Sequence, residues 1–442
     1  MSEREVWTTR FSFIMAMLGF SIGIGNLWRF PYLVGKYGGG IFLAFYLLVV
    51  LLLTVPLFAV EITLGKATRK DPVGAYKTLA PRTPWFLNGY LNVATMILIT
   101  GYASPILGYI LAYAFKTAGG TFSRLSSADM AGYFSRFLSN RLEVVAWTLA
   151  TVIFLGLIVR RGLNKGVETA NNLMLPALFL ILLILIVRAV TLPGVSKGLA
   201  FYLKPDISKF TWEGAVAAIG QTFFAVGVAM ATALVYGSYL PRESKKVIAN
   251  STIVVLTSTA VAILAGLIIF PSVFSFGLDP ASGFGLTFIT MPNVFNKMPA
   301  GALFGTLFYI LFFLAAVTSF IGGYEAIIAW LRDEYRIPRE RGVWITGAGV
   351  MAIAVFSAAS GAFFKLADYV ANNIFLILGA TFMAIFAGWV WKIPNFAKAA
   401  AIESKSAIRV WTVIVKYVAP VIMIITWLSQ LKVLDRIVRL FR

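Results

Sequence analysis

The segment LGFSIGIGN, residues 18–26, interrupts an apolar run that begins near Phe11 and continues to residue 36. It places three glycines and an asparagine inside a stretch long enough to cross a bilayer, for which about 20 helical residues suffice. Small residues permit close packing of helices. Together with the polar Asn26, however, they favour a helix that is broken halfway across the membrane, where unpaired main-chain groups are costly unless a ligand or side chain satisfies them.

The composition of the 442 residues is that of a membrane protein. Hydrophobic residues make up 60% of the chain and charged residues 13%, with a mean hydropathy of +0.86, whereas about a quarter of a soluble domain is charged. The net charge of +20 would suggest nucleic-acid binding in a soluble protein. Here the basic residues cluster in short loops between apolar runs, so we expect a lipid bilayer as partner and no nucleic acid. The absence of cysteine and histidine removes thiol chemistry and the commonest general base, which argues against an enzyme.

The apolar segments predict an all-α polytopic membrane protein with about eleven spans, forming a single domain over residues 1–442. The domain divides into a first repeat of about 11–189, a second of about 213–391 and an additional span near 412–431. A loop over residues 276–299 is too broken for a span and is expected to contain a short extracellular helix. The predicted spans lie near residues 11–36, 40–65, 87–116, 143–160, 168–189, 213–238, 247–275, 301–331, 342–360, 367–391 and 412–431.

Most lysines and arginines fall in loops on one side of the membrane, which the positive-inside rule assigns to the cytoplasm. We therefore predict a cytoplasmic N-terminus in a cell inner (plasma) membrane, with polar residues 1–10 that do not form a signal peptide. An odd number of spans places the C-terminus outside. The tail over residues 432–442 is basic and amphipathic, which fits that side poorly. Either the count is off by one, or the tail lies along the membrane surface.

A second interruption, FFAVGVA over residues 223–229, lies in the sixth predicted span, five spans after the first. Alone it would favour close helix packing, but paired interruptions in corresponding halves indicate a binding site between inverted repeats. The carbonyl end of a broken helix suits a cation and the amide end suits a carboxylate, so a sodium ion and a zwitterion would satisfy both. Glu61, deep in the second span, is expected to accept hydrogen bonds from the freed amides, with a protonated or snorkelling carboxyl as the alternative.

Several motifs resemble the neurotransmitter:sodium symporter family, in the family's order, and the resemblance extends from Trp7 to about Pro420. It is closest to shorter prokaryotic members, similar to the bacterial leucine transporter, that have no twelfth span. It implies the LeuT fold, with 5+5 inverted-repeat helices of which the first and sixth are broken. It also implies a sodium-driven symporter of an amino acid that works by alternating access. The motifs are GNLWRFP at 25–31, GQTFF at 220–224, GLIIFP at 266–271 and FFLAAVTS at 312–319.

The resemblance implies a first sodium site built from hard oxygen ligands. They are the carbonyls of Gly19, Ile22 and Ala315 and the hydroxyls of Thr318 and Ser319. The alternative for the two hydroxyls is a hydrogen bond to a carbonyl one turn earlier in their own helix.

A second sodium site is eroded relative to the family pattern, which leaves open whether one or two sodium ions move in each cycle. Asn26 and the Ser21 carbonyl match the pattern, but Ala225 offers only a carbonyl, and Thr257 aligns with the family's asparagine. Chloride is equally open, because the chloride pattern is incomplete. In that pattern Tyr46 and Gln221 match, and Val261 supplies no oxygen.

The implied substrate site lies between the two breaks, with the substrate carboxylate on the amides near Gly23–Gly25. The third span normally adds a tyrosine hydroxyl; here Ala103 aligns with it, and Pro105 could rotate the helix to bring in Tyr102. The small Gly227 and Gly323 suggest room for a large apolar or aromatic side chain. The remaining candidates for the side-chain subsite are Ser21, Ile99, Phe224, Ala225, Met230 and Ser319.

Two charge pairs are expected to act as gates. Arg29 and Asp368 would close the outer side, and Arg4 and Asp333 the inner side, beside Trp7, Ser238 and Tyr239. The alternative is isolated interfacial charges, each worth less than about 1 kcal/mol. Two other functions stay open: a sensor or binding protein that occludes substrate without transport, and an ion channel, for which no continuous polar pore is evident. The oligomeric state is not predicted.

Overall fold

The computed structural model describes residues 4–126, 128–278 and 285–431, and this part of the chain is helical without any strand. The predicted tail 432–442 lies outside the described residues. Within these described ranges, nine unbroken helical segments are long and apolar enough to cross a bilayer. They are Gly40–Thr68 (α3 Gly40–Val49, η2 Val50–Thr54, α4 Val55–Thr68), α6 Phe86–Ala118, α8 Arg141–Arg160, Leu163–Val190 (η4 Leu163–Glu168, α9 Thr169–Val190), α13 Val247–Ser275, α15 Gly301–Tyr335, α16 Arg339–Ala359, Gly361–Val390 (α17 Gly361–Tyr369, η7 Val370–Phe375, α18 Leu376–Ile385, η8 Phe386–Val390) and Lys405–Gln430 (α20 Lys405–Trp411, η9 Thr412–Val418, α21 Ala419–Gln430).

The first and sixth predicted spans are the two broken ones. The first consists of α1 (Arg10–Ser21) and, after a bend of 51°, Gly25–Lys36, which comprises the π-helical turn η1 (Gly25–Arg29) and α2 (Phe30–Lys36). The sixth consists of α11 (Trp212–Val226) and α12 (Thr232–Ser238). With the nine unbroken segments they correspond one to one to the predicted spans.

Short helices lie outside the spans at both ends of the molecule. One of them, η6 (Leu286–Thr290) with α14 (Met291–Asn296), is the short helix expected in the loop 276–299. The others are α5 Pro72–Leu79, η3 Phe122–Arg124, α7 Asp129–Ser139, α10 Val195–Leu203, η5 Ile207–Lys209 and α19 Ile393–Ala400.

Local main-chain geometry explains where the broken helices stop. The helix α1 begins at a Thr9 cap, whose side chain accepts from the Ser12 amide, and ends where Ile22 turns extended at φ −101° and ψ 92°. The helix α11 ends at Gly227, which adopts the left-handed region at φ 82°. Ala229 and Ala231 follow with φ of 60° and 66°. A left-handed conformation costs a residue with a side chain about 1–2 kcal/mol, so the second break is held against local preference.

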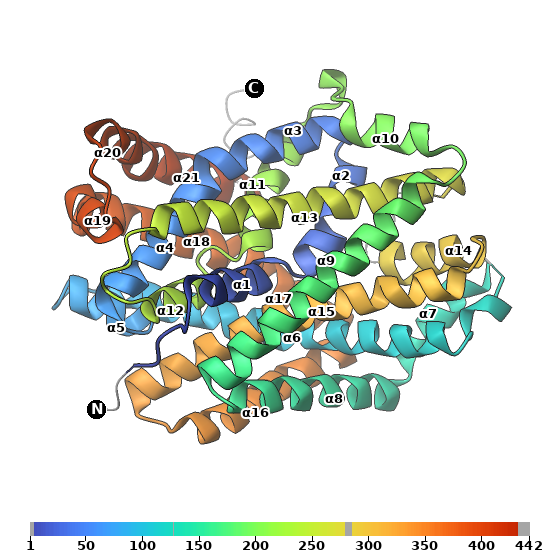
Figure 1. The fold of residues 1–442 in the computed structure, drawn as a ribbon, viewed down its shortest axis with the longest axis horizontal. Coiled ribbons are helices and arrows are strands. Elements are labelled where there is room, and N and C mark those ends of the chain that lie inside the picture. Colours follow the sequence, from blue (N-terminus) through green and yellow to red (C-terminus); the bar gives the residue numbers. More distant parts are fainter. Residues whose placement is uncertain (1–3, 127, 279–284, 432–442) are drawn as a thin grey trace.

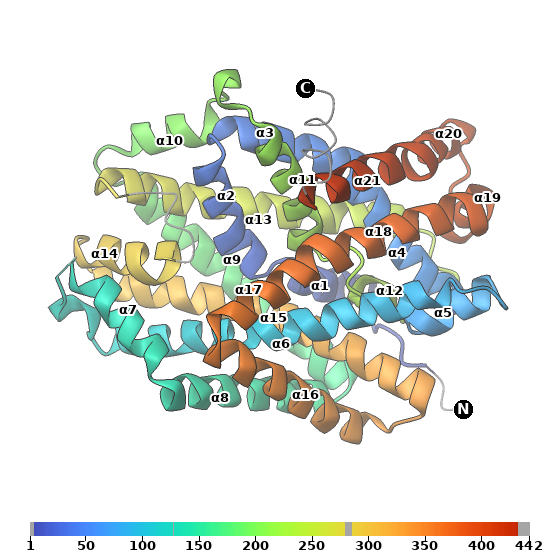
Figure 2. The same cartoon turned by 180° about the vertical axis from the view of Figure 1, so that it is seen from behind.

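The broken helices lie in the interior of the bundle. Figure 1 shows α1 between α13 and α15, and it packs against both; Figure 2 shows α6, α17 and α18 on the other side. The outer helices α8, α9 and α21 instead leave large apolar side chains exposed, including Leu149, Leu180 and Val421, as expected for surfaces that contact lipid.

The two ends of the bundle differ in the loops they carry. In Figure 1 the N-terminal segment, α5, α12 and α19 gather at one end, while α7, α10 and α14 gather at the other. The predicted cytoplasmic loops join helices at the first of these ends. The last span ends at the side of the bundle where α11 begins. There the Ser429 hydroxyl accepts a hydrogen bond at 2.9 Å from the Trp212 indole, at the start of α11. The described chain therefore finishes at the opposite end from where it begins.

Candidate functional site

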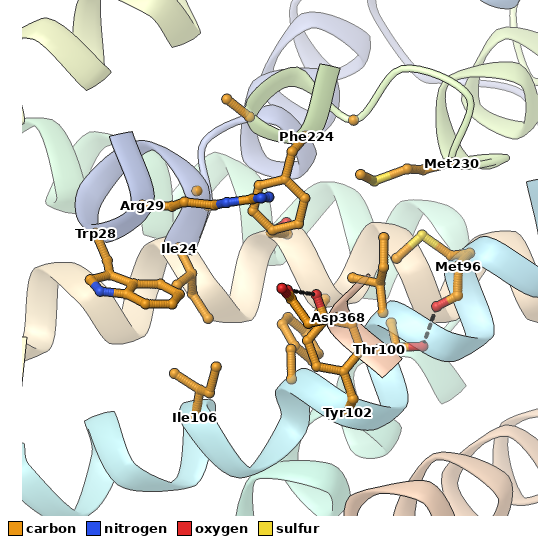
Figure 3. A pocket seen from close by; sticks show the side chains of 18 of the residues that line it. Ile24, Trp28, Arg29, Met96, Thr100, Tyr102, Ile106, Phe224, Met230 and Asp368 are labelled. Atoms are coloured by element: carbon orange, nitrogen blue, oxygen red, sulfur yellow. Dashed lines mark hydrogen bonds between the residues drawn. The ribbon is translucent and has the colours of Figure 1, made fainter. Parts of the chain in front are cut away.

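A cavity of about 280 Å³ lies between the two helix breaks. Figure 3 shows it lined from η1, α6, α11 and the segment after α11, with Asp368 of α17 on one side and Arg29 on another. Nine of the eleven predicted substrate-site residues line the cavity. They are Gly23, Gly25, Ile99, Tyr102, Phe224, Ala225, Gly227, Met230 and Ser319.

The two remaining predicted residues, Ser21 and Gly323, do not line the cavity. The Ser21 hydroxyl donates to the Val226 carbonyl at 3.0 Å, so it links the ends of the two breaks. At Gly323 a side chain would lie 2.4 Å from the Met96 methyl carbon. The expected room at Gly323 is therefore filled by Met96, and likewise Phe20 fills the space at Gly227, where a side chain would lie 2.4 Å from its ring.

Sequence analysis missed several large side chains of the cavity wall, among them Phe20, Met96 and Phe320. The sequence pattern could have identified one of them, Met96. Residues 96, 99, 100, 103 and 106 follow one helical face of α6 and all line the cavity. Extending the stripe one turn from Ile99 finds Met96.

The third span presents both candidate residues, Tyr102 and Ala103, to the cavity. The Tyr102 hydroxyl donates to Asp368 Oδ1 at 2.9 Å and accepts from Asn372 Nδ2 at 2.9 Å. Asn372 also donates to Asp368 Oδ1 at 2.8 Å. The tyrosine is thus tied to the outer acidic residue.

The outer charge pair flanks the cavity without direct contact. The Arg29 guanidinium lies over the Phe224 ring, 4.7 Å from its centre, where the ring face attracts a cation. Its Nη1 is buried, and no described residue forms a hydrogen bond with it. Within the described chain no ion pair joins Arg29 to Asp368. A bound molecule or water could therefore bridge them.

The inner charge pair is closed. Arg4 forms an ion pair with Asp333 and donates to the Ser238 hydroxyl from Nε at 3.0 Å and from Nη2 at 2.6 Å. Its guanidinium lies 5.0 Å from the centre of the Tyr239 ring. The Trp7 indole donates to the Tyr236 carbonyl at 2.9 Å. The predicted inner-gate residues thus meet, and they fasten the N-terminal segment to α12 and α15.

A second group of charges, which sequence analysis missed, extends this closure. Glu5 pairs with Arg339 at 2.9 Å and with Arg332 at 3.2 Å. Arg339 also pairs with Glu325, a fully buried carboxylate that accepts from the Tyr239 hydroxyl at 2.6 Å. Burial alone would raise the pKa of Glu5, but Arg339, the Leu163 amide and Arg332 hold it below its ordinary value. Glu5 is therefore ionised at neutral pH.

The residues assigned to the first sodium site have the chemistry that a sodium ion requires. The Gly23 amide donates to Asn26 Oδ1 at 3.2 Å rather than to the Gly19 carbonyl one turn earlier. Thr318 donates within its own helix to Leu314 at 2.9 Å and Ala315 at 3.1 Å, the expected alternative. Ser319 donates across to the Phe20 carbonyl at 3.0 Å. A donating hydroxyl keeps lone pairs for a cation, so these oxygens fit the ion.

The buried carboxylate Glu61 forms a hydrogen bond to the main chain of the second break. Its Oε2 accepts from the Ala229 amide at 2.7 Å, which is the expected hydrogen bond to a freed amide of the sixth span. Its Oε1 is buried, with no hydrogen-bond partner in the described part of the chain.

Comparison with known proteins agrees with this geometry. Residues 4–125 and 136–438 match the Sodium:neurotransmitter symporter family. The chain belongs to this family. It is 33% identical to YhdH, an uncharacterized sodium-dependent transporter of Bacillus subtilis, over 98% of this chain and 100% of the relative. A sodium-dependent transporter of Haemophilus influenzae is 31% identical over 97% and 98% of the two chains.

The fold agrees as well. The crystal structure of MhsT in complex with L-phenylalanine superposes with a TM-score of 0.91 at 32% identity, covering 97% of this chain and 100% of that chain. The symporter therefore has the LeuT fold implied by its motifs, and it is a sodium-dependent membrane transporter of a small molecule, not an enzyme.

At the residues predicted for a second sodium site, the register of α13 differs from the prediction by one residue. Ser258, and not Thr257, faces Asn26, whose Nδ2 donates to the Ser258 carbonyl and hydroxyl at 3.0 Å each. The Ser258 hydroxyl donates to the Ser21 carbonyl at 2.6 Å. Thr257 lies on a half-buried face of α13. A side-chain oxygen that the sequence alignment did not find therefore lies beside Asn26 and the Ser21 carbonyl.

At the chloride position of the symporter pattern, Gln221 Nε2 donates to the Gly25 carbonyl at 2.8 Å, which ties α11 to η1. Val261 is buried and brings no oxygen.

Proposed function

We propose that this sodium-dependent transporter carries an apolar or aromatic amino acid through the central cavity. One observation carries the proposal: the cavity lies between two helix breaks, with polar main chain at the breaks and mostly apolar side chains elsewhere. A zwitterion matches the first feature, and an uncharged side chain matches the second. The presence of L-phenylalanine in the MhsT structure supports this substrate class.

The two breaks offer opposite partial charges to such a substrate. Main-chain amides at Gly23–Gly25, where η1 begins, would bind the carboxylate, because a helix N-terminus carries partial positive charge. The C-terminal end of α11 at Val226 would face the ammonium group. The substrate side chain would then contact Ile99, Phe224 and Met230.

Sodium, the co-substrate, would bind beside this site. The first ion would contact the carbonyls of Gly19, Ile22 and Ala315 and the hydroxyls of Thr318 and Ser319. Hard oxygen donors suit such a cation. A second ion would find Asn26 Oδ1, the Ser21 carbonyl and the Ser258 hydroxyl, and a substrate carboxylate would complete its shell.

Transport would proceed by alternating access. We propose that the end with the N-terminal segment faces the cytoplasm, so the Arg4–Asp333 pair closes the cytoplasmic path in the form described here. Inward release requires Arg4 to part from Asp333 and Ser238. The membrane potential would contribute about 2.3 kcal/mol per charge moved for each 100 mV.

Uptake by purified protein in proteoliposomes tests the proposal. Labelled phenylalanine, leucine, glycine and lysine are offered with an inward sodium gradient or with potassium in its place. We expect sodium-driven accumulation of the apolar and aromatic amino acids and none of lysine. Accumulation of lysine alone would contradict the substrate class. Binding without flux would favour an occluding sensor, and single-channel currents without accumulation would favour a channel.

A further inference from the structure

The fifth span holds a buried amide that the first sodium site does not include. Asn171, on α9, is fully buried. Its Nδ2 donates to the Val167 carbonyl at 2.8 Å, one turn earlier in the helix. Because a carbonyl can only accept, this contact fixes which end of the amide faces Val167. The oxygen Oδ1 points the other way, is buried, and has no hydrogen-bond partner among the residues that the structure describes.

This oxygen lies against Gly19, in the last turn of α1 before the first helix break. A Cβ atom placed on Gly19 would lie 1.8 Å from Asn171 Oδ1 and 3.1 Å from Thr318 Cβ. The amide of the fifth span and the side chain of Thr318 therefore meet over Gly19. Two of these three residues, Gly19 and Thr318, are those to which the family resemblance assigns the first sodium ion. Any larger residue at Gly19 would displace the Asn171 oxygen.

An unpartnered oxygen at this place needs an explanation. Buried side-chain oxygens in native proteins almost always have a partner, and inside a membrane the cost of leaving one without is not relieved by solvent. Every other group of the implied site is likewise an uncharged oxygen donor, the type that hard cations prefer. A cation among Gly19, Thr318 and Asn171 would satisfy the amide oxygen.

We propose that Asn171 Oδ1 is a further oxygen of the first sodium site, contributed by the fifth span. The inference rests on the proposed assignment of sodium to Gly19, Ile22, Ala315, Thr318 and Ser319, and it adds a third helix to the two that carry those residues.

Asn171 would also connect the ion to the inner closure. Three residues before it, Glu168 accepts from the Thr8 amide at 2.8 Å, and from the Thr8 hydroxyl at 2.8 Å and 3.0 Å. Nearby, the Leu163 amide donates to Glu5 Oε1 at 3.0 Å. The start of the fifth span is therefore bonded to the N-terminal segment that carries Arg4. An ion bound to Asn171 would hold this part of the span against α1, which favours the closed inner side.

The test measures sodium binding without transport, as the rise in thermal unfolding temperature of the purified full-length protein when sodium replaces choline at constant ionic strength. Asn171→Leu removes both polar atoms at similar size. We expect it to raise the sodium concentration for half-maximal stabilisation about tenfold or more, as for the loss of one ligand to a charge. We also expect it to leave the sodium-free protein at least as stable, because an unpartnered oxygen is removed.

Asn172→Leu is the matched control. Asn172 is the next residue on the same helix, and its Oδ1 likewise has no hydrogen-bond partner among the described residues. The residue as a whole is half-buried, and its Nδ2 lies 3.5 Å from the Ser12 hydroxyl, whereas Asn171 Oδ1 lies over Gly19. The control variant should keep the wild-type sodium response. If Asn171→Leu keeps that response too, the proposal is wrong, and a buried water is the partner of the oxygen. If Asn171→Leu lowers the stability of the sodium-free protein, the amide is structural and the proposal also fails.

Thr318→Ala separates this inference from the assignment on which it rests. Loss of the sodium response in Thr318→Ala with a wild-type response in Asn171→Leu overturns only the role of Asn171. An undiminished response in both variants overturns the sodium site itself. Thr306→Ala, on the same helix and with the same hydrogen bond to a carbonyl one turn earlier, controls for the loss of a threonine.

Discussion

Glu61 Oε2 lies 2.7 Å from the amide nitrogen of Ala229, so a carboxylate of the second span caps the break of the sixth. Ala229 has a φ of 60° and lies in the protein interior, where no water can replace the missing helical hydrogen bond. The left-handed main chain after α11 therefore depends on a side chain far away in the sequence.

Removing this acceptor should destabilise the break. Glu61→Leu leaves the Ala229 amide buried and unpaired, which costs about 1–3 kcal/mol. Glu61→Gln keeps a carbonyl oxygen at the same place and should be close to wild type in unfolding temperature. The check is thermal unfolding of both variants in the same detergent; equal stability of the two would show that the hydrogen bond does not support the break.

The Arg4–Asp333 pair should control access from the inner end. Asp333→Asn weakens the ion pair, so the N-terminal segment should detach more often. The chain has no cysteine, which permits a single reporter at Tyr236→Cys, under the Trp7 ring, whose centre lies 5.1 Å from that of Tyr236. We expect the reporter to react with a membrane-impermeant maleimide several-fold faster in Asp333→Asn than with the gate intact.

Glu340→Gln provides the control for this labelling experiment. Glu340 pairs with Arg160 at 2.5 Å on the exposed surface, so its replacement removes an exposed ion pair that includes neither Arg4 nor Asp333. It should leave the labelling rate unchanged. If Asp333→Asn is labelled no faster than this control, the Arg4–Asp333 pair does not close the inner path. The pair would then be an ordinary interfacial ion pair worth less than about 1 kcal/mol.

Asp71, beside the inner gate, should make stability depend on pH. Burial, with the neighbouring Asp333 and Glu334, raises the pKa of Asp71 to about 7 from an ordinary value of 3.8. Folding therefore takes up a proton between about pH 4 and 7, and stability falls as the pH rises through that window. Asp71→Asn keeps the helix cap, since asparagine caps as well as aspartate. Above pH 7 the free energy of unfolding of the variant should exceed that of wild type by at most about 4 kcal/mol, which is seen as a higher unfolding temperature. Near pH 4 the two proteins should be equally stable.

Asp206→Asn tests whether the pH dependence of stability comes from the surroundings of Asp71 or from the loss of a negative charge anywhere in the protein. Asp206 also caps a short helix, but it is exposed, and hydrogen bonding to Ser208 lowers its pKa. The variant loses the same charge and should not gain stability above pH 7. A gain in both variants would point to net charge and not to the surroundings of Asp71.

The parts of the molecule that sequence predicted are those with local causes. Apolar length sets the spans, and glycines with one asparagine set the first break. The missed parts depend on contacts between distant segments: Ser258 faces Asn26 through a register of α13 that alignment misses by one residue, and Met96 fills the space at Gly323 through packing of α6 on α15. The second break was harder to predict from the sequence, because the residues with positive φ include alanines and not only glycine. The amide of one of them, Ala229, is hydrogen-bonded by Glu61 from another span.

Met96 should limit the size of the substrate. Its methyl carbon occupies the space over Gly323, at the inner part of the cavity wall. Met96→Ala opens this space, so a larger aromatic side chain gains contacts while a small aliphatic one leaves a void. One methylene in an apolar pocket changes discrimination about tenfold or more, and the variant should shift the uptake ratio of tryptophan to leucine by at least that much. Competition of both amino acids for sodium-driven uptake measures the ratio. Met130→Ala, equally buried but on α7 away from the cavity, should keep the wild-type ratio; an unchanged ratio in Met96→Ala would place the side-chain subsite elsewhere in the cavity.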